Sequence, residues 1–346
     1  MMKKKVIHAI LGLFLLLLLG YVWMIQSNPV IGEQYAQQVY PIVSNVLSSF
    51  SNIFPFSLSD LTIVLSVVGL IVYPFYARYR KRSYRSIILH TLGYLAFIYG
   101  WFYVAWGGNY FRMPFYERTN IERVAYDSAH FQSFLTNYST ELNASYCEDL
   151  KLDTLLIQQT GMEGYNKLSD TYGMLSPKEL IPAKPMLSNY AMSQVGVLGY
   201  MAPFFSEFCV NDELLSVQYP FSYMHELAHR LGIASEAEAN LYAYLICSAA
   251  TDSTIRFSGY MSLFPYVMGN AAQALSETQY RAFASTIRPE VWALYKEKRT
   301  YWDEKYNPLI GEIQHKVYNL FLKGNNIPNG TANYSQVIGL LLSLPK

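Results

Sequence analysis

Three long apolar segments occupy the first 106 residues and limit the folds open to this chain. Residues 6–25 form one apolar run, and residues 59–77 and 86–106 form two more. A helix needs about 20 such residues to cross a bilayer, so each segment is predicted to be a transmembrane helix. Three lysines precede the first run, as in a signal peptide, but its core is long and no small-residue cleavage site follows. We therefore expect a retained anchor.

The positions of the basic residues predict the orientation of these helices. Lys3, Lys4 and Lys5 precede the first segment, and the short loop 78–85 carries five more Lys and Arg residues, whereas residues 26–57 carry none. Basic loops remain on the cytoplasmic side. We expect an integral protein of the cytoplasmic (inner) membrane, with a cytoplasmic N-terminus and with residues 107–346 in the periplasm or otherwise outside the cytoplasm.

Residues 107–346 form a second predicted domain, distinct from the membrane domain 1–106. Apolar positions recur at helical spacing in 119–148, 149–167, 256–275 and 278–323, with Pro289 and Pro308 as breaks. Residues 186–215 are richer in Gly, Pro and β-prone residues, which predicts one or two short strands. The last apolar run, 337–344, is too short to span a bilayer and is expected to pack on the domain. A net charge of +1 without a basic patch argues against a nucleic-acid partner.

Residues 225–229 read His-Glu-Leu-Ala-His and carry the clearest chemical signal in the chain. On a helix, His225 and His229 leave the same face one turn apart, so both can bind one zinc ion. Glu226 then reaches the open coordination position as the general base for a zinc-bound water. Pro220 favours a helix start just before the motif, and Gly232 favours its end just after.

A second helix is predicted to supply the third zinc ligand. Ser235 and Glu238 have the spacing of a capping box, in which the hydroxyl and the carboxylate each bind a backbone amide at the helix start. Glu236 and Glu238 point to different sides of a helix, so one of them faces the metal. We favour Glu236, keep Glu238 as the alternative, and expect Asn240 to hydrogen-bond a ligand.

Other parts of the site are less defined by the sequence. Tyr260, Arg256 and His315 are candidates for stabilising the transition state. An extended substrate is expected to pair with an edge strand within residues 206–215. Cys247 is expected to be buried, which leaves Cys147 and Cys209 as the pair for any disulfide.

The segment 199–260 resembles a bacterial membrane family, the domain of unknown function 3810. The matching motifs are Gly199-x-x-x-Pro203-x-x-x-Glu207, Val210-Asn211, Pro220-Phe221-Ser222 with the HELAH motif, Gly232, Glu236-Ala-Glu-Ala-Asn240, and Arg256-Phe-Ser-Gly259-Tyr260. The three apolar segments and the stretch 106–112 are similar too. The HELAH motif and the glutamate helix also resemble gluzincins, with Asn240 standing where that group has Asp. These resemblances imply a zinc metallopeptidase-like domain.

Together these features predict a mainly α fold, with three N-terminal transmembrane helices followed by a mostly helical, zincin-like extracytoplasmic domain with a small β element. The predicted function is a membrane-anchored zinc metallopeptidase that acts on peptides or proteins of the cell envelope. The alternative is a non-catalytic envelope protein in which zinc only joins two helices. A fourth protein ligand, Glu207 or Glu238, would mark that alternative, because structural zinc sites are closed.

Overall fold

The computed structural model describes residues 2–124, 127–328, 330 and 336–345, and it is mostly helical. The chain divides into two compact units. Unit 1 comprises Met1–Met113 together with Ala202–Glu207, and unit 2 comprises Pro114–Met201 together with Phe208–Lys346. The sequence-based boundary at residue 106 lies shortly before the end of the first segment of unit 1.

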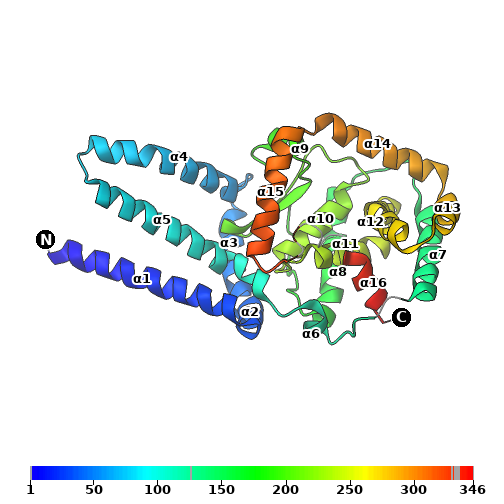
Figure 1. The fold of residues 1–346 in the computed structure, drawn as a ribbon, viewed down its shortest axis with the longest axis horizontal. Helices are drawn as coiled ribbons and strands as arrows, with labels where there is room; N and C mark the ends of the chain where they lie inside the picture. The colour runs from blue at the N-terminus through cyan, green and yellow to red at the C-terminus, as the bar shows by residue number, and fades with distance from the viewer. Residues whose placement is uncertain (1, 125–126, 329, 331–335, 346) are drawn as a thin grey trace. The chain divides into compact units, whose positions relative to one another are not determined.

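Unit 1 contains three helices long and apolar enough to cross a membrane. Their apolar stretches are Ala9–Ser27 in α1 (Met2–Ser27), Leu58–Tyr79 (α4) and Tyr84–Ala105 (α5), and few of these residues are buried. Figure 1 shows the three helices side by side. Apolar side chains that are exposed along a long helix suit a hydrocarbon environment. The prediction of three spans is confirmed, and the chain has the features of a membrane protein.

The segment between the first two spans is also helical. It forms α2 (Pro29–Gln34), a π-helical turn η1 (Tyr35–Val39) and α3 (Tyr40–Ser51), and a 3-10 turn η2 (Gly107–Phe111) follows α5. Arg112 anchors this region through a salt bridge of 2.7 Å to Glu33. Both side chains are largely buried, so the pair holds α2 to the segment that follows α5.

Glu207 closes the N-terminus of α4. Its carboxylate accepts hydrogen bonds from the backbone amides of Leu58 (3.2 Å) and Ser59 (3.0 Å), and Ser57 Oγ lies 3.5 Å away. The first amides of a helix have no partner within the helix, and they carry partial positive charge. Glu207 therefore stabilises the start of the second span.

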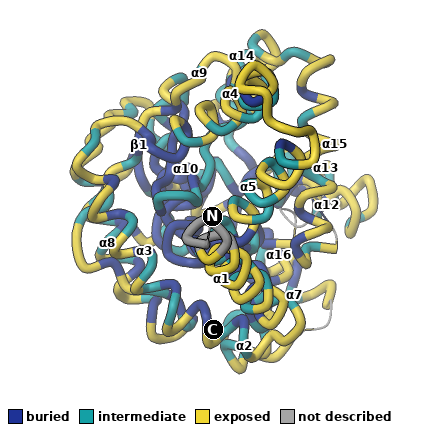
Figure 2. Tube along the Cα trace, turned by 90° about the vertical axis from the view of Figure 1, so that its left-hand side faces the viewer, coloured by how far each residue is buried: buried dark blue, intermediate teal, exposed yellow. Residues whose placement is uncertain are grey.

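Unit 2 is a helical body built around three buried helices: α10 (Tyr219–Arg230), α11 (Glu236–Ser248) and α12 (Ser253–Ala274). In Figure 2 the tube of α10 is dark blue, whereas α1 of unit 1 is mostly yellow. The surrounding helices are α6 (Phe115–Thr119), α7 (Ser128–Ser145), α8 (Thr154–Tyr172), α9 (Asn189–Gln194), α13 (Glu277–Ser285), α14 (Pro289–Lys305), α15 (Pro308–Gly324) and α16 (Val337–Ser343).

The helix breaks predicted at Pro289 and Pro308 are confirmed, whereas the break between α6 and α7 was not predicted. Pro289 and Pro308 each stand in the first turn of a helix, where a missing amide proton does no harm. α16 is buried on the domain, as expected. The helix predicted for 119–148 is confirmed from Ser128 to Ser145 (α7) but begins later than expected, because Asn120 adopts a left-handed conformation with φ of 55° and ends α6. Asp127 then caps the separate helix α7.

The small β element is a three-stranded sheet of β1 (Lys184–Pro185), β2 (Gly199–Ala202) and β3 (Glu207–Val210). The strand order is β1-β3-β2, and β1 runs parallel to β3 with Lys184 opposite Cys209. The prediction of an edge strand within 206–215 was wrong, since β3 is the central strand and β2 lies at an edge. None of the three cysteines forms a disulfide, so the predicted pair Cys147 and Cys209 is not bridged.

Candidate metal centre

The histidine motif lies on a helix that begins and ends where the sequence predicts. Pro220 stands in the first turn of α10, and every residue from Pro220 to Arg230 is buried. Gly232 follows the helix with φ of 88°, a left-handed conformation that glycine adopts without strain. The Ile233 amide then donates to the Ala228 carbonyl at 3.1 Å, which closes the last turn.

This turn fixes the orientation of His229. The Ile233 carbonyl lies 2.6 Å from His229 Nδ1, and because a carbonyl can only accept, Nδ1 carries the proton. His229 Nε2 is then the nitrogen that can bind a metal. A backbone carbonyl on the far nitrogen is the usual support for a metal-binding histidine.

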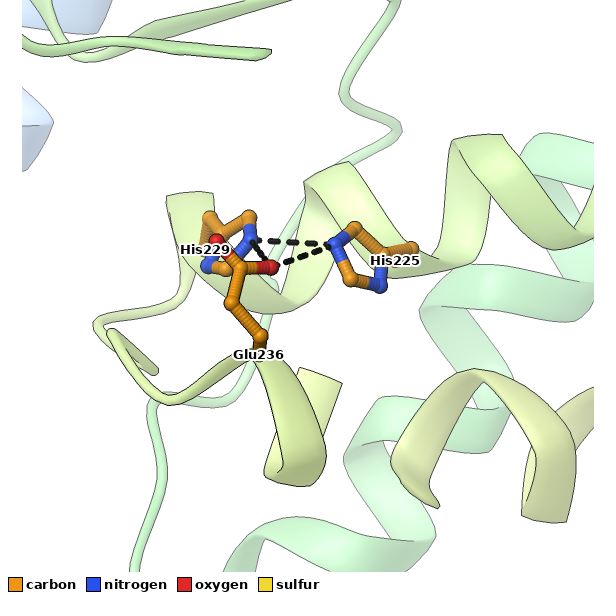
Figure 3. A group of neighbouring side chains, drawn as sticks. All are labelled: His225, His229 and Glu236. Atoms are coloured by element: carbon orange, nitrogen blue, oxygen red, sulfur yellow. Dashed lines mark hydrogen bonds and ion pairs between the residues drawn. The ribbon is translucent and has the colours of Figure 1, made fainter. Parts of the chain in front are cut away.

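Glu236 brings its carboxylate to the two histidines from the first turn of α11. Glu236 Oε2 lies 3.1 Å from His225 Nε2 and 3.3 Å from His229 Nε2, and the two Nε2 atoms lie 3.1 Å apart. Figure 3 shows these three side chains converging from α10 and α11. All three are buried, and they are the group of potential ligands found among the described residues. Two imidazole nitrogens and one carboxylate oxygen match the ligands of a catalytic zinc site.

The charges in the cluster also suit a cation. Burial alone raises the pKa of Glu236, but the attraction and hydrogen bonds of His229 and His225 outweigh it and hold that pKa well below its usual range. Burial lowers the pKa of His229, but the charge of Glu236 outweighs it and raises that pKa to about 9. The Glu236 carboxylate therefore stabilises a proton on the His229 imidazole, which shows that the cluster favours positive charge.

Glu226 lies beside the cluster under the backbone of β2. It is 5% exposed, and no hydrogen-bond donor within the described residues reaches its Oε2. A Cβ atom added to Gly199 would lie 2.6 Å from Glu226 Cγ and Oε1, so only glycine allows this approach. Burial raises the pKa of Glu226 to about 7, although the two histidines lower it. A carboxylate with that pKa can both accept and release a proton near neutral pH.

Glu238 lies away from the histidines and has other partners. Its carboxylate forms a salt bridge with Arg118 and accepts a hydrogen bond from Tyr242 (3.1 Å). The Ser235 hydroxyl caps α11 by accepting from the Glu238 amide at 3.4 Å, which is one half of the predicted capping box, whereas the Glu238 carboxylate binds Arg118 and Tyr242. The structure therefore places Glu236, and not the alternative Glu238, with the histidines.

Neither proposed fourth ligand lies in the cluster. Glu207 caps α4 in unit 1, and Glu238 is engaged by Arg118. Within the described residues, the cluster consists of His225, His229 and Glu236 alone. A metal held by three protein ligands keeps one position open for a water or a substrate.

The remaining predicted residues have other surroundings. Asn240 forms a side-chain hydrogen bond with Tyr266 of α12. Tyr260 packs edge-on against Tyr244, with ring centroids 5.5 Å apart. Arg256 donates to the carbonyl of Ala250 at 3.4 Å.

Tyr318 of α15 contacts the cluster but was not predicted from the sequence as a site residue. Its hydroxyl donates a hydrogen bond of 2.7 Å to Glu236 Oε1, the carboxylate oxygen that does not face the histidines. His315, a sequence candidate, is exposed and lies one turn before it on the same helix. The tyrosine stands 82 residues from Glu236. Only its position on the inward face of an amphipathic helix could have suggested it.

A family model described as "Protein of unknown function (DUF3810)" matches residues 35–342. This range extends from the segment between the first two spans through both units and the histidine cluster. No curated protein and no solved structure matches the chain. Because the match covers most of its length, the chain belongs to the DUF3810 family.

Proposed function

We propose that this chain is a membrane-anchored zinc metallopeptidase. The observation that carries the proposal is the convergence of His225 Nε2, His229 Nε2 and Glu236 Oε2 next to the buried carboxylate of Glu226. A bound zinc ion would lower the pKa of a water ligand toward about 7 and polarise a peptide carbonyl. The three ligands come from two adjacent helices, so the donor set is available without rearrangement of the chain.

The protein residues have distinct roles in this proposal. Glu226 accepts a proton from the attacking water and delivers it to the departing amine, and the burial that raises its pKa in the metal-free protein favours the protonated form that delivers this proton. The Ile233 carbonyl and Tyr318 orient His229 and Glu236 from behind. Extended peptide is expected to pair with the edge strand β2, because Gly199 brings that backbone against Glu226.

The proposed site lies outside the cytoplasm. This orientation is supported by the basic residues before α1 and between α4 and α5, and by their absence from residues 26–57. Substrates would then be peptides or proteins of the cell envelope, and the membrane would be the inner one.

The proposal is tested by digestion of a proteome-derived peptide library with the full chain in lipid nanodiscs. We expect cleavage by the wild type, none by Glu226→Gln, and restored cleavage when zinc is returned after chelation. Glu297→Gln is the matched control, because Glu297 is an exposed glutamate on α14. Zinc bound by the wild type without any difference in cleavage from Glu226→Gln would favour the alternative, a zinc ion that only joins two helices.

A further inference from the structure

Helix α15 (orange in Figure 1) carries an apolar stripe on its outer face. Two of its most exposed members, Leu309 and Leu320, are 79% and 70% exposed. The exposed members of the stripe are Leu309, Ile310, Ile313, Val317, Leu320 and Phe321. Their spacing places all six within about a third of a helical turn of one another. A continuous apolar surface of this kind on a folded domain marks a contact surface.

The opposite face of α15 holds the helix to unit 2. Leu322 is fully buried, Gly311 is buried against Tyr306, and Tyr318 donates to Glu236. The helix therefore cannot turn its apolar stripe inward without breaking these contacts. The stripe needs a partner outside unit 2.

We propose that the apolar stripe of α15 lies in the surface of the lipid bilayer that holds the three spans. The chain itself argues for this partner: α5 ends at Ala105 and unit 2 begins at Pro114. Even fully extended, that connection reaches only about 30 Å. The covalent tether keeps the bilayer at a high effective concentration near α15.

The polar residues beside the stripe also suit a membrane surface. Lys316 and Lys323 lie on one border of the stripe, and Lys316 is 70% exposed while it pairs with Glu312 at 2.7 Å. Lysine side chains can lie along apolar surface and extend their charge to the lipid headgroups. Helices with this arrangement sit about 5–10 Å into the boundary between headgroups and acyl chains.

The test uses two exposed residues on opposite sides of α15. Ile313 lies in the stripe and is 66% exposed, and His315, about 200° further around the helix, is also exposed. Each is replaced by cysteine in the full chain with Cys147→Ser, since Cys209 and Cys247 are buried. An environment-sensitive fluorophore is attached, and the protein is placed in nanodiscs that contain lipids with a nitroxide near the headgroup.

We expect the nitroxide lipids to quench the label at Ile313 much more than the label at His315, and iodide in the buffer to show the reverse. Equal access of iodide to both positions would refute the proposal. Protection of Ile313 from both quenchers would also refute it, because protein, such as a second copy of the chain, would then cover the stripe. None of these readings depends on zinc binding or catalysis.

Discussion

Tyr318 offers the sharpest mutational test of how the metal centre is held. Its hydroxyl donates a hydrogen bond of 2.7 Å to Glu236 Oε1, while Glu236 Oε2 faces the two histidines. The change Tyr318→Phe removes one oxygen atom and leaves the three ligands in place. Glu236 then loses the hydrogen bond that restrains its carboxylate, so zinc binding should weaken.

The size of the effect follows from the environment of this hydrogen bond. Loss of a group that orients a metal ligand lowers metal affinity by about 10- to 100-fold. That range equals about 1.4 to 2.7 kcal/mol, and a hydrogen bond to a charged group contributes about 1.5 to 3 kcal/mol. Glu236 is buried but Tyr318 is only partly buried, so water can replace some of the interaction. We therefore expect a loss near the lower end, about tenfold.

The assay is competition for zinc between the detergent-purified full chain and a fluorescent chelator of known affinity. Tyr301→Phe is the control, because it also removes a tyrosine hydroxyl whose hydrogen bond, 2.8 Å to the Glu213 carbonyl, lies away from the ligands. We expect a higher Kd for Tyr318→Phe and an unchanged Kd for Tyr301→Phe, with both variants folded by circular dichroism. Equal Kd values for Tyr318→Phe and the wild type would refute the assigned role.

Three further predictions concern the base, a buried ion pair and pH. Gly199→Ala places a methyl group 2.6 Å from Glu226 Oε1, so peptide cleavage should be lost while zinc content is kept; unchanged cleavage would contradict the placement of the base. Arg118→Met leaves the buried Glu238 charge unpaired and should lower the free energy of unfolding by about 3–5 kcal/mol, measured by denaturation in detergent, whereas an unaffected midpoint would show that the pair contributes little. In zinc-free protein, folding raises the pKa of His229 from 6.5 to about 9, so its contribution to stability is full below pH 6.5 and lost as the pH rises through about 9. Thermal unfolding should show this loss without zinc and a smaller one with zinc; identical profiles would argue against the His229 assignment.

The sequence predicts the parts of this fold that depend on local patterns. The three spans follow from apolar length alone, and α10 follows from Pro220 at its start and Gly232 at its end. The convergence of His225 and His229 follows from their spacing on one helix. The choice of Glu236 over Glu238 also follows from helix geometry, since the two residues point to different sides.

The sequence does not predict contacts between distant segments. Glu207 caps α4 across a separation of 148 residues, and neither side carries a local signal of the pairing. The central position of β3 depends on β1, a strand of two residues that is too short to show any periodicity. Arg118 meets Glu238 across a separation of 120 residues, and this contact removes Glu238 from the candidate ligands.

Zinc binding by His225, His229 and Glu236 is tested most directly by the zinc content of the purified full chain, measured by inductively coupled plasma mass spectrometry. We expect one zinc ion per chain in the wild type, in Glu226→Gln and in Glu238→Gln, and none in His225→Ala or Glu236→Ala. Absence of zinc from the wild type after reloading, or full occupancy in His225→Ala, would contradict this expectation.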